Sequence, residues 1–399
     1  MTRRLRVLRT LVARLGFLVG RLRRVKPHVV LATSHSAVLT GNLAWIRDEL
    51  ARRDPPIPSV EVTPGTSRSK LAYFASTFRA GYHLASARAF VVDDYFFPMY
   101  VITPRPGTTR IQVWHAAGAF KKFGYSVVEK TFGADSDLIA KVRIHSNYDL
   151  ALVSSMSVAP HYAEAFDAPL EIFTASVGIP RTDLLTNPAL RAAAEARVRA
   201  RYPAIEGRRV VLYAPTFRGA SVGHARHADL MDLDAMRRVL GDGWVVLLKL
   251  HPFVRTSLVI PEGLEGFAID ASGEADVNEL MLVSDVLVSD YSSVIYEFAL
   301  LGRPILFLAP DEDAYDLERG FYFDFRSAAP GPIFDTTEAL AEAIRAGDHD
   351  LERVRAFAAA SFDVTDGHAT ARLVDQLLVP ALEGHLVTAA DLAAGSPGA

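Results

Sequence analysis

The chain has 399 residues, 50% of them hydrophobic and 22% charged, which is more than one hydrophobic core usually supports and excludes a disordered or low-complexity protein. Cysteine is absent, so disulfide frameworks, thiolate metal sites and cysteine nucleophiles are excluded. The net charge of -3 is unevenly distributed, because residues 1–26 hold nine basic side chains and no acid, which leaves -12 on the rest of the chain.

The first 26 residues predict a basic amphipathic helix. At about 100° per residue, the apolar side chains share one half of the helix and most of the arginines take the other half. This pattern is typical of a helix that lies on an anionic membrane surface, although an acidic partner could also bind it; the acidic body disfavours nucleic acid. The longest uncharged stretch, residues 15–20, is too short for a transmembrane span of about 20 residues. The apolar residues are Leu5, Leu8, Leu11, Val12, Leu15, Leu18, Val19 and Leu22.

From residue 27 onward, short apolar runs alternate with helical patterns, as in parallel sheets flanked by helices. We expect two doubly wound, Rossmann-like α/β domains that face a central cleft, residues 27–185 and 186–385, with a hinge at about 178–207 and a flexible tail at 386–399. Ligands of such folds bind beyond the carboxyl ends of the strands. The predicted strands are 29–32, 89–92, 111–114, 150–153, 210–214, 245–250, 286–289 and 305–308, and the predicted helices include 68–87, 158–166, 188–202, 294–301, 351–360 and 370–382.

His115 follows the predicted strand 111–114 and precedes a turn of small residues that leads to Lys121 and Lys122. A histidine beside a flexible turn can meet a substrate as a general base, because its unperturbed pKa lies near neutrality. The alternative is a half-buried histidine whose ring is satisfied by the backbone. The residues alone leave both interpretations open.

Basic and hydroxyl side chains also follow strands in the second half. His251 lies at the end of strand 245–250, and strand alternation predicts that it shares one side with Lys249. Thr216 and Arg218 follow strand 210–214, and the Arg218 guanidinium has a fork of donors that suits phosphate oxygens. Together they predict a pyrophosphate-binding edge.

Residues 289–293 come directly after strand 286–289 and begin a helix. Asp290, Ser292 and Ser293 could form an anion site with the backbone N–H groups of that helix, and Glu297 could accept hydrogen bonds from a ribose. Helix capping by the same residues is the alternative. Neither a Walker A loop nor a G-x-G-x-x-G fingerprint is present at a strand-to-helix turn.

Metal chemistry is not indicated by the sequence. His224 and His227 have only Asp229 near ligand spacing, and the acidic pairs and triplets at 93–94 and 311–313 are more typical of solvated loops or helix caps than of a cation site. The serine hydrolase elbow G-x-S-x-G is also absent. We therefore predict no metal and no cofactor.

Eight short strings, taken in order from about residue 90 to 375, resemble the CDP-glycerol glycerophosphotransferase family, the teichoic acid primases and polymerases. Each string is short, but their order makes the resemblance specific. The strings are QVWHAAGAFKKFG (112–124), GIPRTD (178–183), YAPTFR (213–218), LHP (250–252), SDYSS (289–293), RGFYFD (319–324), PGP (330–332) and DGH (366–368).

The resemblance implies a GT-B type fold with an N-terminal acceptor domain and a C-terminal domain that binds the CDP donor. It implies transfer of glycerol phosphate, or ribitol phosphate, to a hydroxyl of a lipid-linked cell-surface polymer on the cytoplasmic face of the membrane, with CMP as the leaving group. The family's two important histidines map onto His115 and His251, and its serine-rich helix start onto Ser292 and Ser293.

The mechanism expected from this resemblance is in-line attack by an acceptor hydroxyl on the phosphorus that bears the polyol. His115 would be the general base, with Lys121 and Lys122 on the acceptor side. On the donor side, charge would be stabilised by His251 and its neighbours. Two alternatives are a GT-B glycosyltransferase with a nucleotide sugar donor and an inactive scaffold. The expected donor-binding residues are Thr216, Arg218, Lys249, Asp290, Ser292, Ser293 and Glu297.

Overall fold

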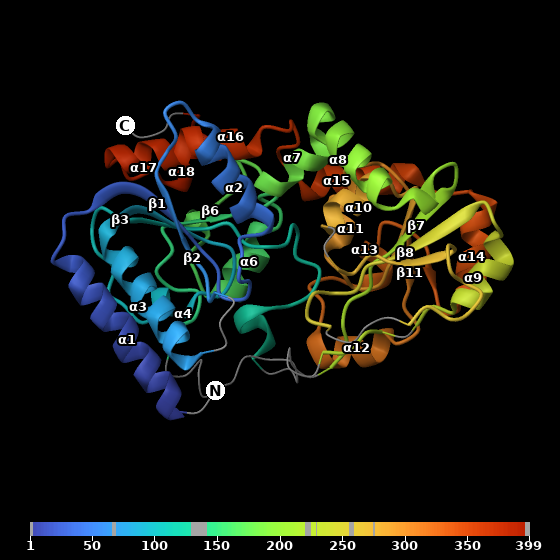
Figure 1. Ribbon diagram of the computed structural model, residues 1–399, viewed down its shortest axis with the longest axis horizontal. Coiled ribbons are helices and arrows are strands. Elements are labelled where there is room, and N and C mark those ends of the chain that lie inside the picture. The colour runs from blue at the N-terminus through green and yellow to red at the C-terminus, as the bar shows by residue number, and fades with distance from the viewer. Residues whose placement is uncertain are drawn as a thin grey trace. The chain divides into compact units, whose positions relative to one another are not determined.

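The protein is described by a computed structural model that covers residues 3–65, 69–128, 142–219, 225–228, 230–254, 259–273 and 276–395. The chain divides into two compact units (Figure 1). The first unit contains Met1–His115, Ala134–Asp183 and Phe362–Ala399, and the second contains Ala116–Gly133 and Leu184–Ser361. Each unit has one parallel six-stranded sheet, so the expected pair of Rossmann-like α/β halves is confirmed.

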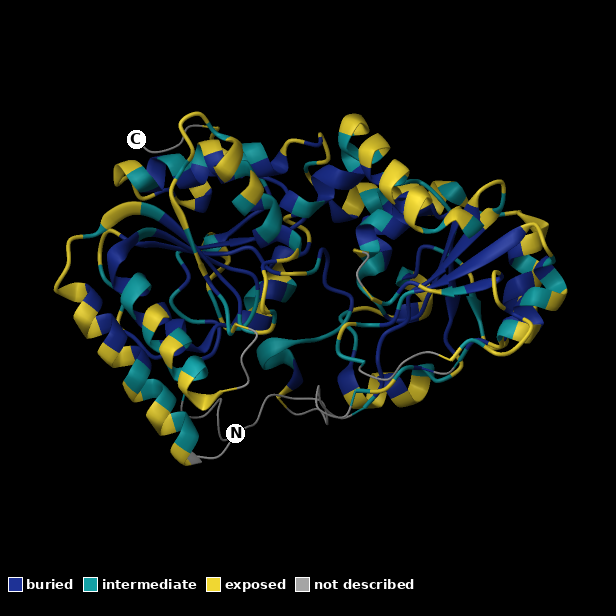
Figure 2. Cartoon of the chain, viewed as in Figure 1, coloured by how far each residue is buried: buried dark blue, intermediate teal, exposed yellow. Residues whose placement is uncertain are grey.

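The sheet of the first unit has the order β2-β1-β3-β4-β5-β6. Its central strands are rich in Val, Leu, Ile and Ala and are buried on both faces, as expected of parallel strands covered by helices (Figure 2). The elements are α1 (Arg3–Arg21), β1 (Lys26–Ala32), α2 (Gly41–Arg52), β2 (Ser59–Val62), α3 (Lys70–Ser86), β3 (Ala87–Val92), α4 (Phe97–Tyr100), β4 (Thr109–Gln112), β5 (Leu150–Leu152), α6 (Ala159–Phe166), β6 (Phe173–Thr174), α16 (Ala369–Leu373), α17 (Val379–Glu383) and α18 (Ala389–Ala393).

The sheet of the second unit has the order β12-β11-β10-β7-β8-β9. Its core joins the central strands to α9 and α14, where Met236, Leu340 and Ile344 are fully buried. The elements are α8 (Pro188–Arg201), β7 (Arg209–Tyr213), α9 (Leu233–Leu240), β8 (Trp244–Leu248), β9 (Ala268–Asp270), α10 (Val277–Leu282), β10 (Val286–Ser289), α11 (Val294–Ala299), β11 (Ile305–Leu308), α12 (Glu312–Arg319), α13 (Phe325–Ala328), β12 (Ile333–Phe334), α14 (Thr337–Ala346) and α15 (Leu351–Ser361); α7 (Asp183–Thr186) begins at the boundary between the units.

The C-terminal segment differs from the sequence expectation, which placed residues up to 385 in the second domain and a flexible tail after them. Residues 362–395 belong to the first unit, because Leu373, Leu377 and Leu378 are fully buried against the core of the first sheet. Asp183 fixes the start of α16 by accepting the N–H groups of Ala369 and Thr370 at 2.8 Å. The expected tail contains α18 rather than only irregular chain.

Helix α1 packs on α3 through small residues rather than through the apolar half predicted from the sequence. Ala13 and Gly16 are buried there, and a Cβ on Gly16 would lie 2.1 Å from the carbonyl oxygen of Phe78, so the two backbones are in close contact. The predicted apolar half stays exposed: Leu11, Leu15 and Leu18 are 55 to 57% exposed. Among the described residues, no helix combines the length and apolar character that a bilayer crossing requires.

Candidate active site

In each unit the order of the strands reverses at one point, and loops after the flanking strands meet there. The reversal lies between β1 and β3 in the first sheet and between β7 and β10 in the second. Doubly wound sheets bind their ligands at such switch points, beyond the carboxyl ends of the strands. Most of the predicted site residues follow strands at or next to these two points, so each unit has a candidate half-site.

The backbone before His115 is held in an unusual conformation. Trp114 has a φ of 49°, in the left-handed region that a bulky residue adopts only when its surroundings impose it. The amide of Asn42 donates to the carbonyl oxygens of Val113 (3.0 Å) and Trp114 (2.8 Å), and the amide oxygen of Gln112 accepts the Trp114 N–H at 2.9 Å. Asn42 and Gln112 are fully buried and therefore fix the direction in which the chain enters His115.

The side chain of His115 has a defined tautomer. Its Nδ1 lies 3.2 Å from the carbonyl oxygen of Asp93, and because a carbonyl can only accept, Nδ1 must carry the proton. A carboxylate oxygen of Asp94 lies 3.8 Å from the same nitrogen. In the neutral ring Nε2 then has the lone pair, and the side chain is 47% exposed. His115 can therefore accept a proton from a ligand, as the sequence interpretation requires.

Asp94 also contacts a second histidine, which the sequence analysis did not select. Nδ1 of His35 lies 3.0 Å from the Asp94 carboxylate, and the backbone N–H of Tyr95 donates to the carboxylate at 2.6 Å. Burial disfavours the charged form of Asp94, but the His115 and His35 rings outweigh it and hold its pKa well below the usual range. The Asp94 hydrogen bond in turn raises the pKa of His35. His35 follows β1, so its position after a strand was the available signal.

Asp93 behaves in the opposite way to its neighbour. Its side chain is 5% exposed, and this burial raises the pKa of Asp93 to about 6, although the His35 ring lowers it in part. The pair 93–94 was expected to be solvated or capping. The structure instead places it at the switch point of the first sheet, with one carboxylate ionised beside two histidines and the other disfavoured as an anion.

Lys121 and Lys122, expected on the acceptor side, belong to the second unit. Backbone bonds tie them to the loop after α12, since Lys122 N–H donates to Gly320 O at 3.0 Å and Lys121 bridges Phe321. Burial lowers the pKa of Lys121 to about 7, and the nearby charge of Arg319 adds to this effect. No described residue accepts a hydrogen bond from the Lys121 ammonium. Lys121 therefore lies with the residues expected to bind the donor.

His251 has the opposite tautomer to His115. The backbone N–H of Phe253 donates to its Nδ1 at 3.2 Å, so in the neutral ring Nε2 carries the proton. The ring packs on Phe217, with centroids 4.8 Å apart, which connects it to the loop after β7. Lys249 donates to the carbonyl of Ser272 at 3.2 Å, and burial lowers its pKa. His251 is thus arranged as a hydrogen-bond donor.

Arg218 is a buried centre of ion pairs rather than an open fork. Its Nη1 contacts an Asp290 carboxylate oxygen at 2.9 Å and the Thr216 carbonyl at 2.8 Å, and Nε and Nη2 contact Asp311 at 2.7 and 3.1 Å. Asp290 is 0% exposed and accepts both the backbone N–H and the hydroxyl of Thr216. These three predicted donor-binding residues are brought together, but in this structure they bind one another and join the loops after β7 and β10.

The serine pair lies at the start of α11, as predicted. Ser292 and Ser293 are partly exposed, and Ser292 accepts the N–H of Val294 at a long 3.5 Å. Glu297 is 1% exposed, so its expected contact with a ribose stays a prediction. Among the described residues, no three His, Asp or Glu side chains gather as a metal site would require. His224 and Asp229 lie outside the described residues.

A family model described as CDP-Glycerol:Poly(glycerophosphate) glycerophosphotransferase matches residues 18–379. The chain belongs to this family. The family's relatives include two proteins of Bacillus spizizenii (strain W23), a teichoic acid ribitol-phosphate primase, 38% identical over 87% of this chain and 90% of the primase, and a teichoic acid poly(ribitol-phosphate) polymerase, 34% identical over 94% of this chain and 60% of the polymerase. A solved structure of the wall teichoic acid polymerase TagF matches with a TM-score of 0.76 and 25% identity, covering 94% of each chain.

These comparisons confirm the resemblance read from the eight strings and the GT-B type of fold. They identify the chain as a transferase of the glycerophosphotransferase family, whose relatives act in teichoic acid synthesis. The roles of individual side chains follow from the geometry of the two half-sites and are argued below as proposals.

Proposed function

We propose that the enzyme transfers ribitol phosphate from CDP-ribitol to a hydroxyl of a membrane-linked acceptor and releases CMP. Both Bacillus relatives have ribitol phosphate in their names, which supports ribitol over glycerol as the donor polyol. The chain is 38% identical to the primase and 34% identical to the polymerase, which supports a primase-type addition to the acceptor. The acceptor is proposed to be held at the cytoplasmic face of the membrane.

The observation that carries the proposal is the opposite tautomers of the two histidines. His115 presents a basic Nε2, so it would take the proton of the acceptor hydroxyl as the new O–P bond forms. The bond between that phosphorus and the CMP oxygen breaks, and CMP leaves with the electron pair. His251 presents Nε2–H, which would donate to a phosphate oxygen as negative charge develops there.

The remaining donor-side residues divide into two groups by their contacts. Lys249, Ser292 and Ser293 would contact the diphosphate, because these residues are partly exposed at the edge where β8 and β10 end. Lys121 would join them, because it is also partly exposed and interacts electrostatically with Asp290 and Arg218. The hydrogen-bonded group of Thr216, Arg218 and Asp290 would hold in place the loops that carry these diphosphate-binding residues.

The test is CMP release from CDP-ribitol, CDP-glycerol and a UDP-sugar in the presence of a lipid-linked acceptor. We expect release with CDP-ribitol, less with CDP-glycerol and none with the UDP-sugar. His115→Ala should lower kcat by about 10²- to 10⁴-fold, the usual range for a lost general base, and His251→Ala should also lower it. His161→Ala, a histidine on α6 away from both switch points, is the matched control. Near-normal turnover of either active-site variant would exclude the role proposed for that residue.

We also propose that α1 binds the membrane surface. Its outward face combines exposed leucines with exposed basic residues such as Arg4 and Arg21, while its other face is already used against α3. Each basic residue near an anionic surface contributes about 1 kcal/mol. The apolar part is therefore available to insert, and the basic part to attract anionic lipid.

This membrane proposal is tested by flotation of the full chain with anionic vesicles. Serine at Leu11, Leu15 and Leu18 should reduce flotation without loss of fold, because all three side chains are exposed. The control carries serine at Leu71, Leu170 and Leu317, which are exposed on other elements. Equal flotation of the two triple variants would exclude α1 as the attachment.

A further inference from the structure

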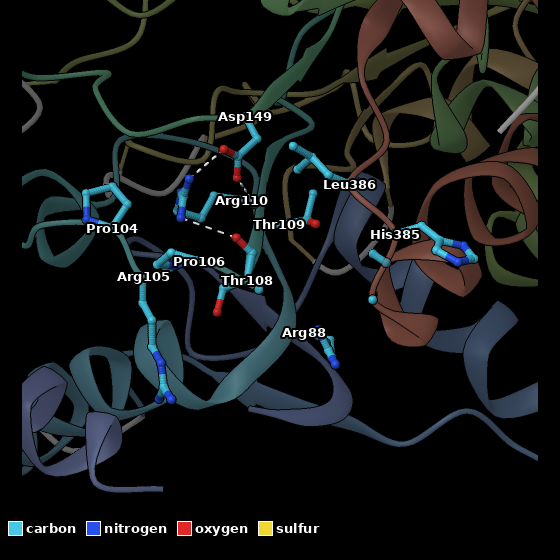
Figure 3. Close-up of a pocket in the computed structure, with 13 residues that line it drawn as sticks. Arg88, Pro104, Arg105, Pro106, Thr108, Thr109, Arg110, Asp149, His385 and Leu386 are labelled. Atoms are coloured by element: carbon cyan, nitrogen blue, oxygen red, sulfur yellow. Dashed lines mark hydrogen bonds and ion pairs between the residues drawn. The ribbon is translucent and has the colours of Figure 1, made fainter. Parts of the chain in front are cut away.

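A cavity of about 350 Å³ opens at one edge of the first sheet (Figure 3). It lies where β3 and β4 begin and where the chain leaves α17, whereas His35, Asp94 and His115 follow the ends of strands at the other edge. No residue of the proposed reaction lines it. Its lining includes Arg88, Arg105, Thr108, Thr109, Arg110, Asp149 and His385.

Three arginines line this cavity, and their partners differ. Arg110 is paired with Asp149, from Nη2 to the carboxylate at 2.5 Å, so this pair adds no net charge (Figure 3). Nη1 of Arg105 donates to the carbonyl oxygens of Ala85 (2.8 Å) and Arg23 (2.9 Å). For Arg88, no residue in the described part of the chain provides a carboxylate or a hydrogen bond. Arg88 is thus a partly exposed cation without a counter-charge.

The guanidinium of Arg88 is seated between two glycines that have positive φ. A Cβ at Gly384 would lie 3.1 Å from Nη1, a tight contact, whereas a Cβ at Gly107 would lie 3.5 Å from it, at ordinary contact distance. The φ angles of 88° and 100° also favour glycine at both positions. The wall further contains Thr108, whose buried hydroxyl has no hydrogen-bond partner among the described residues. The cation is positioned by its surroundings rather than loose on the surface.

We propose that this cavity binds the phosphate ester of a small polyol, with the Arg88 guanidinium on the phosphate oxygens. A guanidinium presents paired N–H donors that match phosphate oxygens, and an anion here would supply the missing counter-charge. The volume exceeds that of a bare phosphate and leaves room for the alcohol. The inference does not depend on the transferase activity, because no catalytic residue is part of the site.

Two sources could supply such a group, a lipid headgroup and a soluble or polymer-borne polyol phosphate. The cavity borders the end of α1, since Arg105 binds the Arg23 carbonyl and Val25 lies near Gly107. Leu22, beside this border, is 84% exposed. A headgroup beneath the outward face of α1 could therefore reach Arg88, and the test has one arm for each source.

The test compares the full chain with Arg88→Gln in two assays. Calorimetry measures binding of glycerol 3-phosphate, and flotation measures binding to phosphatidylcholine vesicles with and without phosphatidylglycerol. We expect Arg88→Gln to weaken binding about 10- to 100-fold in whichever of the two assays contains the natural type of ligand, as loss of a charge-assisted hydrogen bond predicts. Arg88→Lys keeps the positive charge but not the paired N–H donors of the guanidinium, so its affinity should lie between those of wild type and Arg88→Gln. Arg345→Gln, an exposed arginine on α14, removes the same charge as a control.

The outcomes separate the sources and can overturn the inference. Weaker binding of glycerol 3-phosphate supports a soluble or polymer-borne ligand, and weaker binding only to phosphatidylglycerol vesicles supports a lipid headgroup. Unchanged binding in both arms, or an equal loss in Arg345→Gln, would overturn the site. Binding at the catalytic residues contributes equally to the wild type and to Arg88→Gln, because Arg88 lies at the opposite edge of the sheet. Failure of this inference would therefore leave the proposed transferase function untouched.

Discussion

Replacing Asp94 by Asn tests whether the carboxylate supports His115 as a base. The change keeps the shape of the side chain and an oxygen that can accept the Tyr95 N–H, but it removes a negative charge 3.8 Å from Nδ1 of His115. At that distance, two unit charges interact by about 1 kcal/mol in bulk water and about 4 kcal/mol at an effective dielectric of 20. Because His115 is 47% exposed, solvent screens the pair, and the lower part of the range applies.

The imidazolium that forms when His115 takes the proton loses this stabilisation in Asp94→Asn. A loss of about 1 to 2 kcal/mol in the transition state corresponds to about a 5- to 30-fold lower kcat. The assay is CMP release from the CDP-polyol at several pH values, with circular dichroism to check the fold. Asp48→Asn removes an exposed carboxylate on α2 and is the control. A kcat within twofold of wild type would refute the positioning role of Asp94.

Three further predictions concern the residues around the two half-sites. Asn42→Ala removes both hydrogen bonds from the Asn42 amide to the carbonyl oxygens of Val113 and Trp114. It should lower the free energy of unfolding by about 2 to 4 kcal/mol and should change kcat more than it changes KM. Unchanged kinetics would show that the left-handed conformation of Trp114 persists without Asn42. Lys121→Met should be more stable than wild type at pH 7 by about 1 to 3 kcal/mol in urea unfolding. The reason is that folding lowers the pKa of Lys121 from 10.5 to about 7, so the charged lysine disfavours the folded state once the pH falls below 10.5. The gain in stability should vanish by about pH 10.5, and a gain that persists there would contradict this cause. Burial raises the pKa of Asp93 to about 6, so its contribution to stability is present below pH 3.8 and is lost as the pH rises through 6. The free energy of unfolding of Asp93→Asn should match that of wild type at pH 4 and exceed it at pH 8. Parallel pH profiles of the two proteins would contradict this.

Most interior strands of both sheets were predictable because they are short, largely apolar runs buried on two faces. The exception is β4, which is also buried but has the sequence Thr-Arg-Ile-Gln. All eight predicted strands are present, within a few residues of the expected bounds. In the described part of the chain, four strands were missed, the edge strands β2, β6, β9 and β12, which have two to four residues. An edge strand is covered less completely and needs no long apolar run, so the sequence holds little signal for it.

The placement of the C-terminal segment was not predictable from local patterns. The helical pattern at 370–382 is clear in the sequence, but nothing in it tells which of the two sheets will bury its leucines. The capping of α16 by Asp183 depends on two residues that are 186 and 187 positions away. Boundaries of this kind depend on contacts between distant segments, which neither periodicity nor composition encodes.

In the first half-site, strand ends predicted the right neighbourhood but not all of its members. His115 was selected because a string of small residues follows it, whereas His35 was not considered and Asp94 was considered only as part of an acidic pair of solvated or capping residues. Their importance depends on the strand order, because β1, β3 and β4 are adjacent only in the folded sheet. A sequence search that paired titratable residues across all predicted strand ends would have included both.

Arg218 shows why residue type and position do not settle a role by themselves. A guanidinium after a strand can either bind a phosphate or hold neighbouring loops together, and the two roles use the same N–H donors. Four of its five N–H groups are directed at Asp290, Asp311 and the Thr216 carbonyl, so an incoming diphosphate would have to displace an ion pair to reach them. Breaking a buried pair leaves an uncompensated charge and is costly, which favours the supporting role. Lys121, whose ammonium has no such partner among the described residues, is then the better candidate for the phosphate. An anion beside it would raise its lowered pKa again.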